Sequence, residues 1–156
     1  MQISRFAEHR LAVVERTLGW LEHHAMRRGT LPKQAAHLAI GLRGEDAAYF
    51  YLRRLGYTVI ARRWRSAKLR GDIDLIGWDD EHLCFVEVKT RTSRSFQPAE
   101  VAVDREKRAM LMRMAQEYMR QLENRDRIPI RFDVLSVYLA DVSPEFELFR
   151  GAFNSE

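Results

Sequence analysis

Hydrophobic and polar residues alternate along two neighbouring stretches of the chain, residues 71–78 and 83–90, and this period of two predicts β-strands. The turn-prone segment 79–82 joins them, so the strands are expected to form a hairpin. One face of the hairpin is expected to carry Asp72, Asp74, Ile76, Phe85, Glu87 and Lys89, and the opposite face of the first strand Ile73 and Leu75. The charged residues therefore gather on one side of the pair.

The turn sets the register of this hairpin. A turn centred between Asp80 and Glu81 places Asp74 opposite Glu87. The same register pairs Asp72 with Lys89 and Ile76 with Phe85. Two carboxylates that face one another across an antiparallel pair repel by about 3 kcal/mol at roughly 5 Å and an effective dielectric near 20. A divalent cation between them would turn that repulsion into binding.

The spacing of these charges suits a metal-dependent nuclease. Hard cations such as Mg²⁺ or Mn²⁺ take oxygen ligands, and Asp74 and Glu87 with a strand carbonyl would suffice. Lys89, two residues after Glu87, would orient or deprotonate the attacking water or neutralise charge on the phosphate. The alternative is a solvated strand face on which Asp72, Glu87 and Lys89 form ordinary ion pairs.

The remaining periodic segments predict a single α/β domain. The predicted elements are a helix over residues 36–55 that ends at Gly56, a strand over 57–64, a helix from the cap Asp104 to 123, a strand over 131–139 and an edge strand over 145–149. Together with the hairpin they give a mixed sheet flanked by helices, over residues 36–153. Residues 1–32 form a separate N-terminal extension, because an apolar helical stripe over 3–28 precedes a break at 29–32.

Glu45, on the first helix of this domain, is a candidate third metal ligand, either direct or through water. Gly41 and Gly44 beside it would allow close approach to another backbone or to phosphate. The alternative is that Glu45 is simply an acid favoured by the dipole near the N-terminus of its helix. Arg131 and Asp133 share one face of a later strand, and structural pairing at the sheet edge is the favoured interpretation.

Several ordered motifs resemble the YraN-like family of uncharacterised bacterial proteins, UPF0102. They are GLRGEDAAYFYLRRLGYTVIARRWR, GDIDLI, FVEVKTR, a helix that bears Lys107, and RFDV, and they extend from about residue 40 to about residue 153. The resemblance implies a restriction-endonuclease-like fold with three layers, related to archaeal Holliday-junction resolvases. It also implies that Glu45, Asp74, Glu87 and Lys89 stand at catalytic positions. Two residues depart from the family pattern, Asp72 where Glu is usual and Arg63 where Asn is usual.

The charge distribution points to a phosphodiester polymer as the partner. The chain carries a net charge of +4, and the excess is clustered around the acidic centre. The expected nucleic-acid-binding residues are Arg62, Arg63, Arg65, Lys68, Arg70, Arg91, Arg94 and Lys107. A solvated surface loop is the alternative for such a run. Trp64, among the arginines, could stack on a base, although a core position is favoured.

Composition limits the protein class. The chain has 156 residues, of which 46% are hydrophobic, and this is enough for one domain with a substantial core. Its single cysteine, Cys84, excludes an intrachain disulfide and suggests a cytoplasmic setting. Neither a membrane span nor a signal peptide is expected, and the histidine spacing does not suit zinc.

The leading hypothesis is a magnesium- or manganese-dependent nuclease that hydrolyses DNA, with branched DNA and a homodimer suggested by the resemblance to resolvases. The alternative is a catalytically silent nucleic-acid-binding module, and an RNA-directed enzyme or a protein-interaction domain also stays open.

Overall fold

The structure is a computed structural model, and it describes residues 33–91, 104–139 and 143–154. The helix predicted over 3–28, the extension 1–32 and Arg94 therefore lie outside the described residues.

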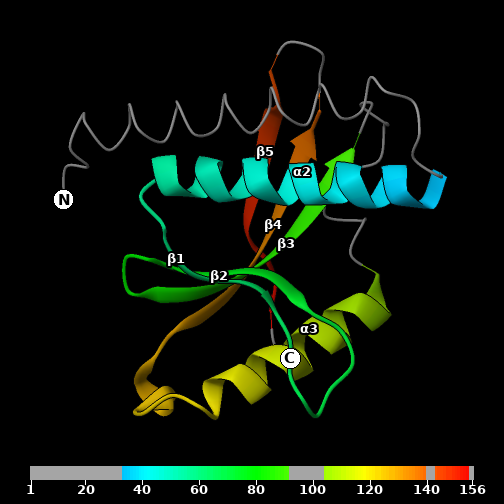
Figure 1. Cartoon of the computed structure of the whole chain (residues 1–156). Helices are drawn as coiled ribbons and strands as arrows, with labels where there is room; N and C mark the ends of the chain where they lie inside the picture. The colour runs from blue at the N-terminus through cyan, green and yellow to red at the C-terminus, as the bar shows by residue number, and fades with distance from the viewer. Residues whose placement is uncertain (1–32, 92–103, 140–142, 155–156) are drawn as a thin grey trace.

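The described residues form an α/β fold with two α-helices and a five-stranded mixed sheet (Figure 1). The elements are, in chain order, α2 (Lys33–Arg54), β1 (Thr58–Trp64), β2 (Ile73–Asp79), β3 (His82–Arg91), α3 (Arg105–Met119), the 3₁₀ turn η2 (Arg125–Arg127), β4 (Ile130–Tyr138) and β5 (Glu145–Phe153). The strands follow the order of the sequence across the sheet. Only β3 and β4 run parallel, and α3 lies in the crossover between them.

The two helices lie on opposite faces of the sheet (Figure 1). Ala48 and Leu52 of α2 pack on one side with Leu75, Val86 and other strand residues. The opposite side is covered by α3, whose buried residues Leu111, Met114 and Ala115 contact Ile76 and Phe85. The order of the layers is helix, sheet, helix, as the alternating pattern predicts.

The predicted register of the β2–β3 hairpin is confirmed, because Ile76 lies opposite Phe85 and Leu75 opposite Val86. The assignment of Ile73 and Leu75 to one face is wrong. Ile73 packs with α3, whereas Leu75 packs on the α2 side. Ile73 is the first residue of its strand and follows the positive-φ residue Gly71 closely, so strict alternation does not extend to it.

Element ends differ from the predictions where local hydrogen bonds decide them. The second helix ends at Met119 rather than at residue 123, because tighter bonds from the Gln121 and Leu122 amides follow and Asn124 is left-handed. The last strand continues to Phe153 rather than ending at 149, since Gly151, with φ 61°, accommodates an irregularity in its pairing with β4.

Two glycines fix how closely the helices approach the charged end of the sheet. A side chain at Gly44 of α2 would collide with Thr90, the residue after Lys89. Gly71 has φ 113°, and a side chain there would collide with Met110 of α3. Gly41, by contrast, has open space around it, so close approach explains only Gly44.

Candidate functional site

The carboxylates of Asp74 and Glu87 are anchored on adjacent strands, near the start of β2 and in the second half of β3. The side chain of Asp74 accepts a hydrogen bond from the Val88 backbone amide at 2.7 Å, which ties it to the residue after Glu87. Glu87 is buried, with 4% of its surface exposed. The sequence predicted this juxtaposition from the hairpin register.

The two carboxylates of Asp74 and Glu87 are electrostatically unfavourable neighbours. Burial and then the charge of Glu87 raise the pKa of Asp74 to about 7, against the lowering effect of the Val88 amide and of Lys107. A carboxyl group whose pKa is raised to this extent lies in surroundings that disfavour its charged form. Such shifts are concentrated at functional sites, where a cation or substrate compensates them.

Two lysines hold the two oxygens of Glu87. Lys89 Nζ donates to Oε1 at 2.8 Å, in agreement with the predicted shared strand face. Lys107 Nζ, from the first turn of α3, lies 2.9 Å from Oε2. Oε2 is buried and accepts no hydrogen bond of good geometry. Burial, the largest single influence, would lower the pKa of Lys107, but its interactions with Glu87 and the charges of Asp74 and Asp72 together outweigh burial, so that the pKa is raised.

The sequence missed the place of Lys107 at the acid pair. Lys107 was predicted only to lie on a helix among the family motifs and to bind nucleic acid. A signal did exist, since a lysine in the first turn of a helix opposes the helix dipole and calls for a nearby acid. The identity of that acid could not be read from the pattern, because α3 is separated from β3 by residues 92–104.

Glu45 is paired with Arg63 in the structure. Its interpretation as an acid favoured by a helix N-terminus is wrong, because α2 begins at Lys33 and Glu45 lies in the helix interior. The charge of Glu45 nevertheless contributes to the raised pKa of Asp74, so the two acids are within electrostatic reach. Within the described ranges, no group of three acids, histidines or cysteines has the spacing of a metal site.

The Asp74–Glu87 pair fits a hard divalent cation in its donor chemistry. Both side chains are carboxylates, which Mg²⁺ and Mn²⁺ prefer. Glu87 Oε2 is buried and is ion-paired with Lys107 without a hydrogen bond of good geometry, and one oxygen of Asp74 accepts a bond from the Val88 amide. One or two carboxylates are sufficient for Mg²⁺ where water and phosphate supply the other ligands.

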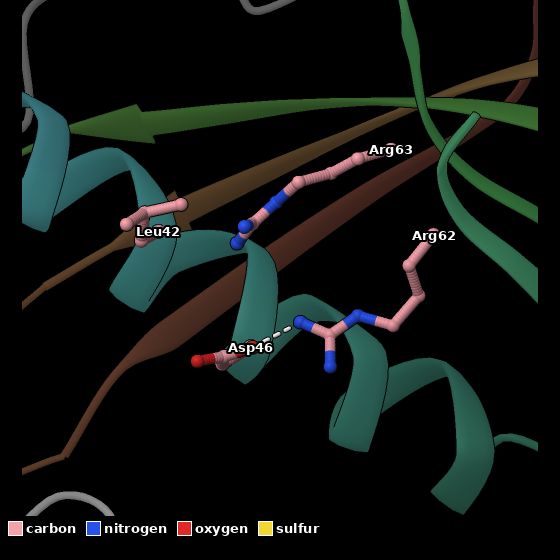
Figure 2. A pocket seen from close by; sticks show the side chains of 4 residues that line it. All are labelled: Leu42, Asp46, Arg62 and Arg63. Atoms are coloured by element: carbon pink, nitrogen blue, oxygen red, sulfur yellow. Dashed lines mark hydrogen bonds and ion pairs between the residues drawn. The ribbon is translucent and has the colours of Figure 1, made fainter. Parts of the chain in front are cut away.

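The predicted basic residues on β1 and the following loop are engaged with acids. Figure 2 shows a hollow lined by Leu42, Asp46, Arg62 and Arg63, in which Arg62 pairs with Asp46. The hydrogen bond to Glu45 raises the pKa of Arg63, as do the charges of Asp46 and Asp74. The hollow therefore lies within electrostatic reach of the acid pair.

The other predicted basic residues are more scattered. Arg65 lies 3.5 Å from Asp72. Lys68 lies 3.0 Å from Glu117 on α3. Arg70 is exposed, Arg91 is the last residue of β3, and Arg94 is not described. Trp64 packs edge-on against Tyr118 in the core, so the favoured core interpretation is confirmed.

A second charged cluster lies around Asp133, which is fully buried. Asp133 accepts bonds from Arg131 at 2.8 and 2.9 Å, from Tyr57 at 3.2 Å and from the Gly151 amide at 2.9 Å. Arg131 also donates to Asp79 at 2.7 Å. Structural pairing of Arg131 with Asp133 is confirmed, but the predicted position at a sheet edge is wrong, because β4 lies between β3 and β5.

Comparison with known proteins assigns the family. The model of the "Uncharacterised protein family UPF0102" matches residues 44–137, more than half of the chain. The chain belongs to UPF0102. The predicted resemblance to the YraN-like family is thereby confirmed, and the matched residues include Glu45, Asp74, Glu87, Lys89 and Lys107.

Individual UPF0102 proteins are similar over most of their length. One from Koribacter versatilis is 46% identical over 122 residues, which cover 78% of this chain and 84% of the relative. One from Solibacter usitatus is 50% identical over 110 residues, 70% of this chain and 82% of the relative. One from Rhodococcus opacus is 37% identical over 120 residues, 76% of this chain and 99% of the relative.

Two further predictions can be compared with the described residues. Cys84 is buried, and burial raises the pKa of its thiol to about 12. Neither of the described α-helices combines the length and the apolar character needed to cross a bilayer.

Proposed function

We propose that this UPF0102 protein is a metal-dependent nuclease that hydrolyses DNA phosphodiester bonds on a restriction-endonuclease-like fold. The observation that carries the proposal is the pair of the partly buried Asp74 and the buried Glu87, in which the pKa of Asp74 is raised to about 7 and two lysines hold Glu87. A purely structural pair has no need for two acids that oppose one another's charge.

In this proposal Asp74 and Glu87 hold Mg²⁺ or Mn²⁺, with Glu45 as a third ligand, direct or through water. A metal ion bound there would polarise the phosphodiester and lower the pKa of a bound water. Lys89 forms an ion pair with Glu87, and its side chain is placed to orient or deprotonate the attacking water, or to neutralise charge on the phosphate. Glu45 would first have to leave Arg63.

The order of elements supports the proposed fold. A helix with an acid precedes three antiparallel strands that carry the acid and Glu-X-Lys positions, and a crossover helix leads to a parallel strand. The hollow at Arg62 and Arg63, within electrostatic reach of Asp74, supports a polyanionic substrate, because guanidinium groups can exchange carboxylates for phosphates. Branched DNA and a C2 dimer are proposed from the resemblance to resolvases.

The test is cleavage of end-labelled four-way junction, flap, duplex and single-stranded DNA, and of RNA, with Mg²⁺, Mn²⁺ or EDTA. Glu87→Gln removes a ligand charge at nearly constant shape, and Asp126→Asn is the matched control on an exposed acid of η2. We expect metal-dependent cutting that Glu87→Gln abolishes and Asp126→Asn retains. No cutting of any substrate by the folded protein would contradict the nuclease proposal.

A second candidate is a catalytically silent nucleic-acid-binding module, favoured by one specific observation. Lys89 and Lys107 already bring two positive charges to the two acids, so the cluster is balanced without a metal ion. Salt-sensitive DNA binding that neither EDTA nor Asp74→Ala changes, together with no cleavage, would favour this module.

A further inference from the structure

The position of Lys107 is unusual for a lysine. Its ammonium lies 2.9 Å from the buried Oε2 of Glu87, and only 26% of its side chain is exposed. Its backbone amide donates at 2.8 Å to the cap residue Asp104, which places Lys107 in the first turn of α3. A long, flexible side chain is thus held inward at a helix terminus.

This position is unfavourable unless the acids compensate it. The N-terminus of a helix carries a partial positive charge, which opposes a cation in the first turn. Partial burial of an ammonium group adds a desolvation cost. Glu87, Asp74 and Asp72 are the negative charges that favour the charged form of Lys107. The acid pair therefore binds a cation already, and that cation is tethered to α3.

The packing of α3 on the segment before β2 fixes the position of the Lys107 backbone. Gly71, just before β2, contacts Met110, one turn after Lys107, so closely that a side chain at position 71 would collide with it. Lys89 differs from Lys107 in its origin, because it lies on β3, the same strand as Glu87, and binds the other oxygen of Glu87. Of the two ammonium groups, the one on α3 approaches the acids from outside their own hairpin.

Charge balance indicates what happens when a metal ion enters. With both lysines in place, Asp74 and Glu87 are neutralised, and a divalent ion would leave an excess of two positive charges. We propose that Lys107 is an internal counter-cation that occupies Glu87 in the absence of metal and is displaced when Mg²⁺ or Mn²⁺ binds. The inference rests on the proposed metal site, and it adds a built-in competitor that sets the affinity of that site.

Displacement would have a functional consequence. A Lys107 ammonium released from Glu87 carries its charge at the mouth of the acid pair, where the phosphate of a polyanionic substrate would attract it. Metal and substrate would then favour one another, because each stabilises the arrangement in which Lys107 has left Glu87.

The experiment measures Mn²⁺ binding without substrate, by isothermal titration calorimetry and by the paramagnetic signal of free Mn²⁺. Lys107→Met keeps the aliphatic stem and removes the competing charge. Arg105→Met is the matched control, since it removes an exposed positive charge from the same turn of α3. Glu87→Gln tests the site itself, and Lys107→Gln replaces Lys107→Met if that variant does not fold.

We expect Lys107→Met to bind Mn²⁺ about five- to tenfold more tightly than the wild-type protein, and Arg105→Met to differ from wild type by less than about twofold. Unchanged or weaker binding by Lys107→Met, while wild type binds and Glu87→Gln does not, would overturn this inference and leave the proposed metal site standing. Absence of Mn²⁺ binding by every folded variant would overturn both.

Discussion

Two charged clusters, each around a buried acid, lie on the same sheet, and they are built differently. Around Asp133 the bases are Arg131 and Arg150, which hydrogen-bond to Asp133 and to the Tyr57 hydroxyl respectively. Around Glu87 the bases are Lys89 and Lys107. The first cluster uses planar donors with several fixed N–H groups, whereas the second uses single ammonium groups on flexible stems.

The difference appears in how completely the acids are satisfied. Each oxygen of Asp133 accepts two hydrogen bonds, whereas Oε2 of Glu87 accepts none of good geometry. Burial would raise the pKa of Asp79 in the arginine cluster, but bonds and charges from Arg131 and Arg150 outweigh it, and the pKa is lowered. The pKa of Asp74 is instead raised to about 7. A satisfied cluster stabilises the fold, and an unsatisfied one is suited to bind something else.

The largest expected effect tests the stabilising role of the arginine cluster. Asp133→Asn should lower the free energy of unfolding by about 3–5 kcal/mol, because it removes the fully buried acid that accepts four hydrogen bonds and leaves the partly buried Arg131 with Asp79 alone. Asp74→Asn makes the same chemical change in the lysine cluster and should cost less than about 1 kcal/mol or stabilise the protein, since it removes carboxylate repulsion. Urea unfolding at pH 8 without metal measures both. Equal losses would contradict the distinction between the clusters.

The next effect tests the lysine cluster for function. Lys89→Met should lower the rate of DNA cleavage by about 100-fold or more, because the ammonium that faces the proposed phosphate position is lost. Its free energy of unfolding should change by no more than about 1 kcal/mol, as measured by urea unfolding, since Lys89 is partly exposed.

Arg150→Met is the matched control for Lys89→Met, since it removes a half-exposed cation from the other cluster. It should leave the cleavage rate within about twofold of wild type. A comparable loss of cleavage in both variants, with both folded, would mean that the two clusters do not differ in function.

A third test uses pH. The folded-state pKa of Asp74 lies above its ordinary value of 3.8, so the folded protein binds the proton more tightly than the unfolded chain between about pH 4 and 7. The contribution of Asp74 to stability therefore falls as pH rises through this window, and its unfavourable effect is complete above about pH 7. Asp79, with a lowered pKa, loses its stabilising effect only below about pH 4.

The measurement is the free energy of unfolding of wild type and Asp74→Asn at pH 5 and pH 8, without metal. The advantage of Asp74→Asn over wild type should grow by about 1–2 kcal/mol from pH 5 to pH 8. Subtraction of the two curves removes groups common to both proteins. A difference that stays constant with pH would show that the pKa of Asp74 is not raised.

The hairpin half of the site could be predicted from the sequence because it is local. The turn at residues 79–82 and the alternation in both strands determine the register that brings Asp74 to Glu87. The contribution of Lys107 could not be predicted, since it depends on how α3 packs over the sheet at Gly71. Beyond the predicted pairing of Arg131 with Asp133, the arginine cluster was missed for the same reason, because Tyr57, Asp79 and Arg150 come from three further segments.

The smallest expected effect concerns Arg63, which pairs with Glu45 as Arg131 pairs with Asp133 but is more exposed, at 40% of its side chain against 19%. An exposed ion pair contributes no more than about 1 kcal/mol to stability, so Arg63 can exchange Glu45 for a phosphate at little cost. Arg63→Ala should weaken DNA binding about three- to fivefold at physiological salt and reduce the salt dependence of binding, as measured by fluorescence anisotropy. Arg125→Ala, on the exposed η2 turn, should leave binding within about twofold of wild type. If the two variants weaken binding equally, the attraction comes from the net charge of the protein, and the hollow beside the acid pair has no special part in binding DNA.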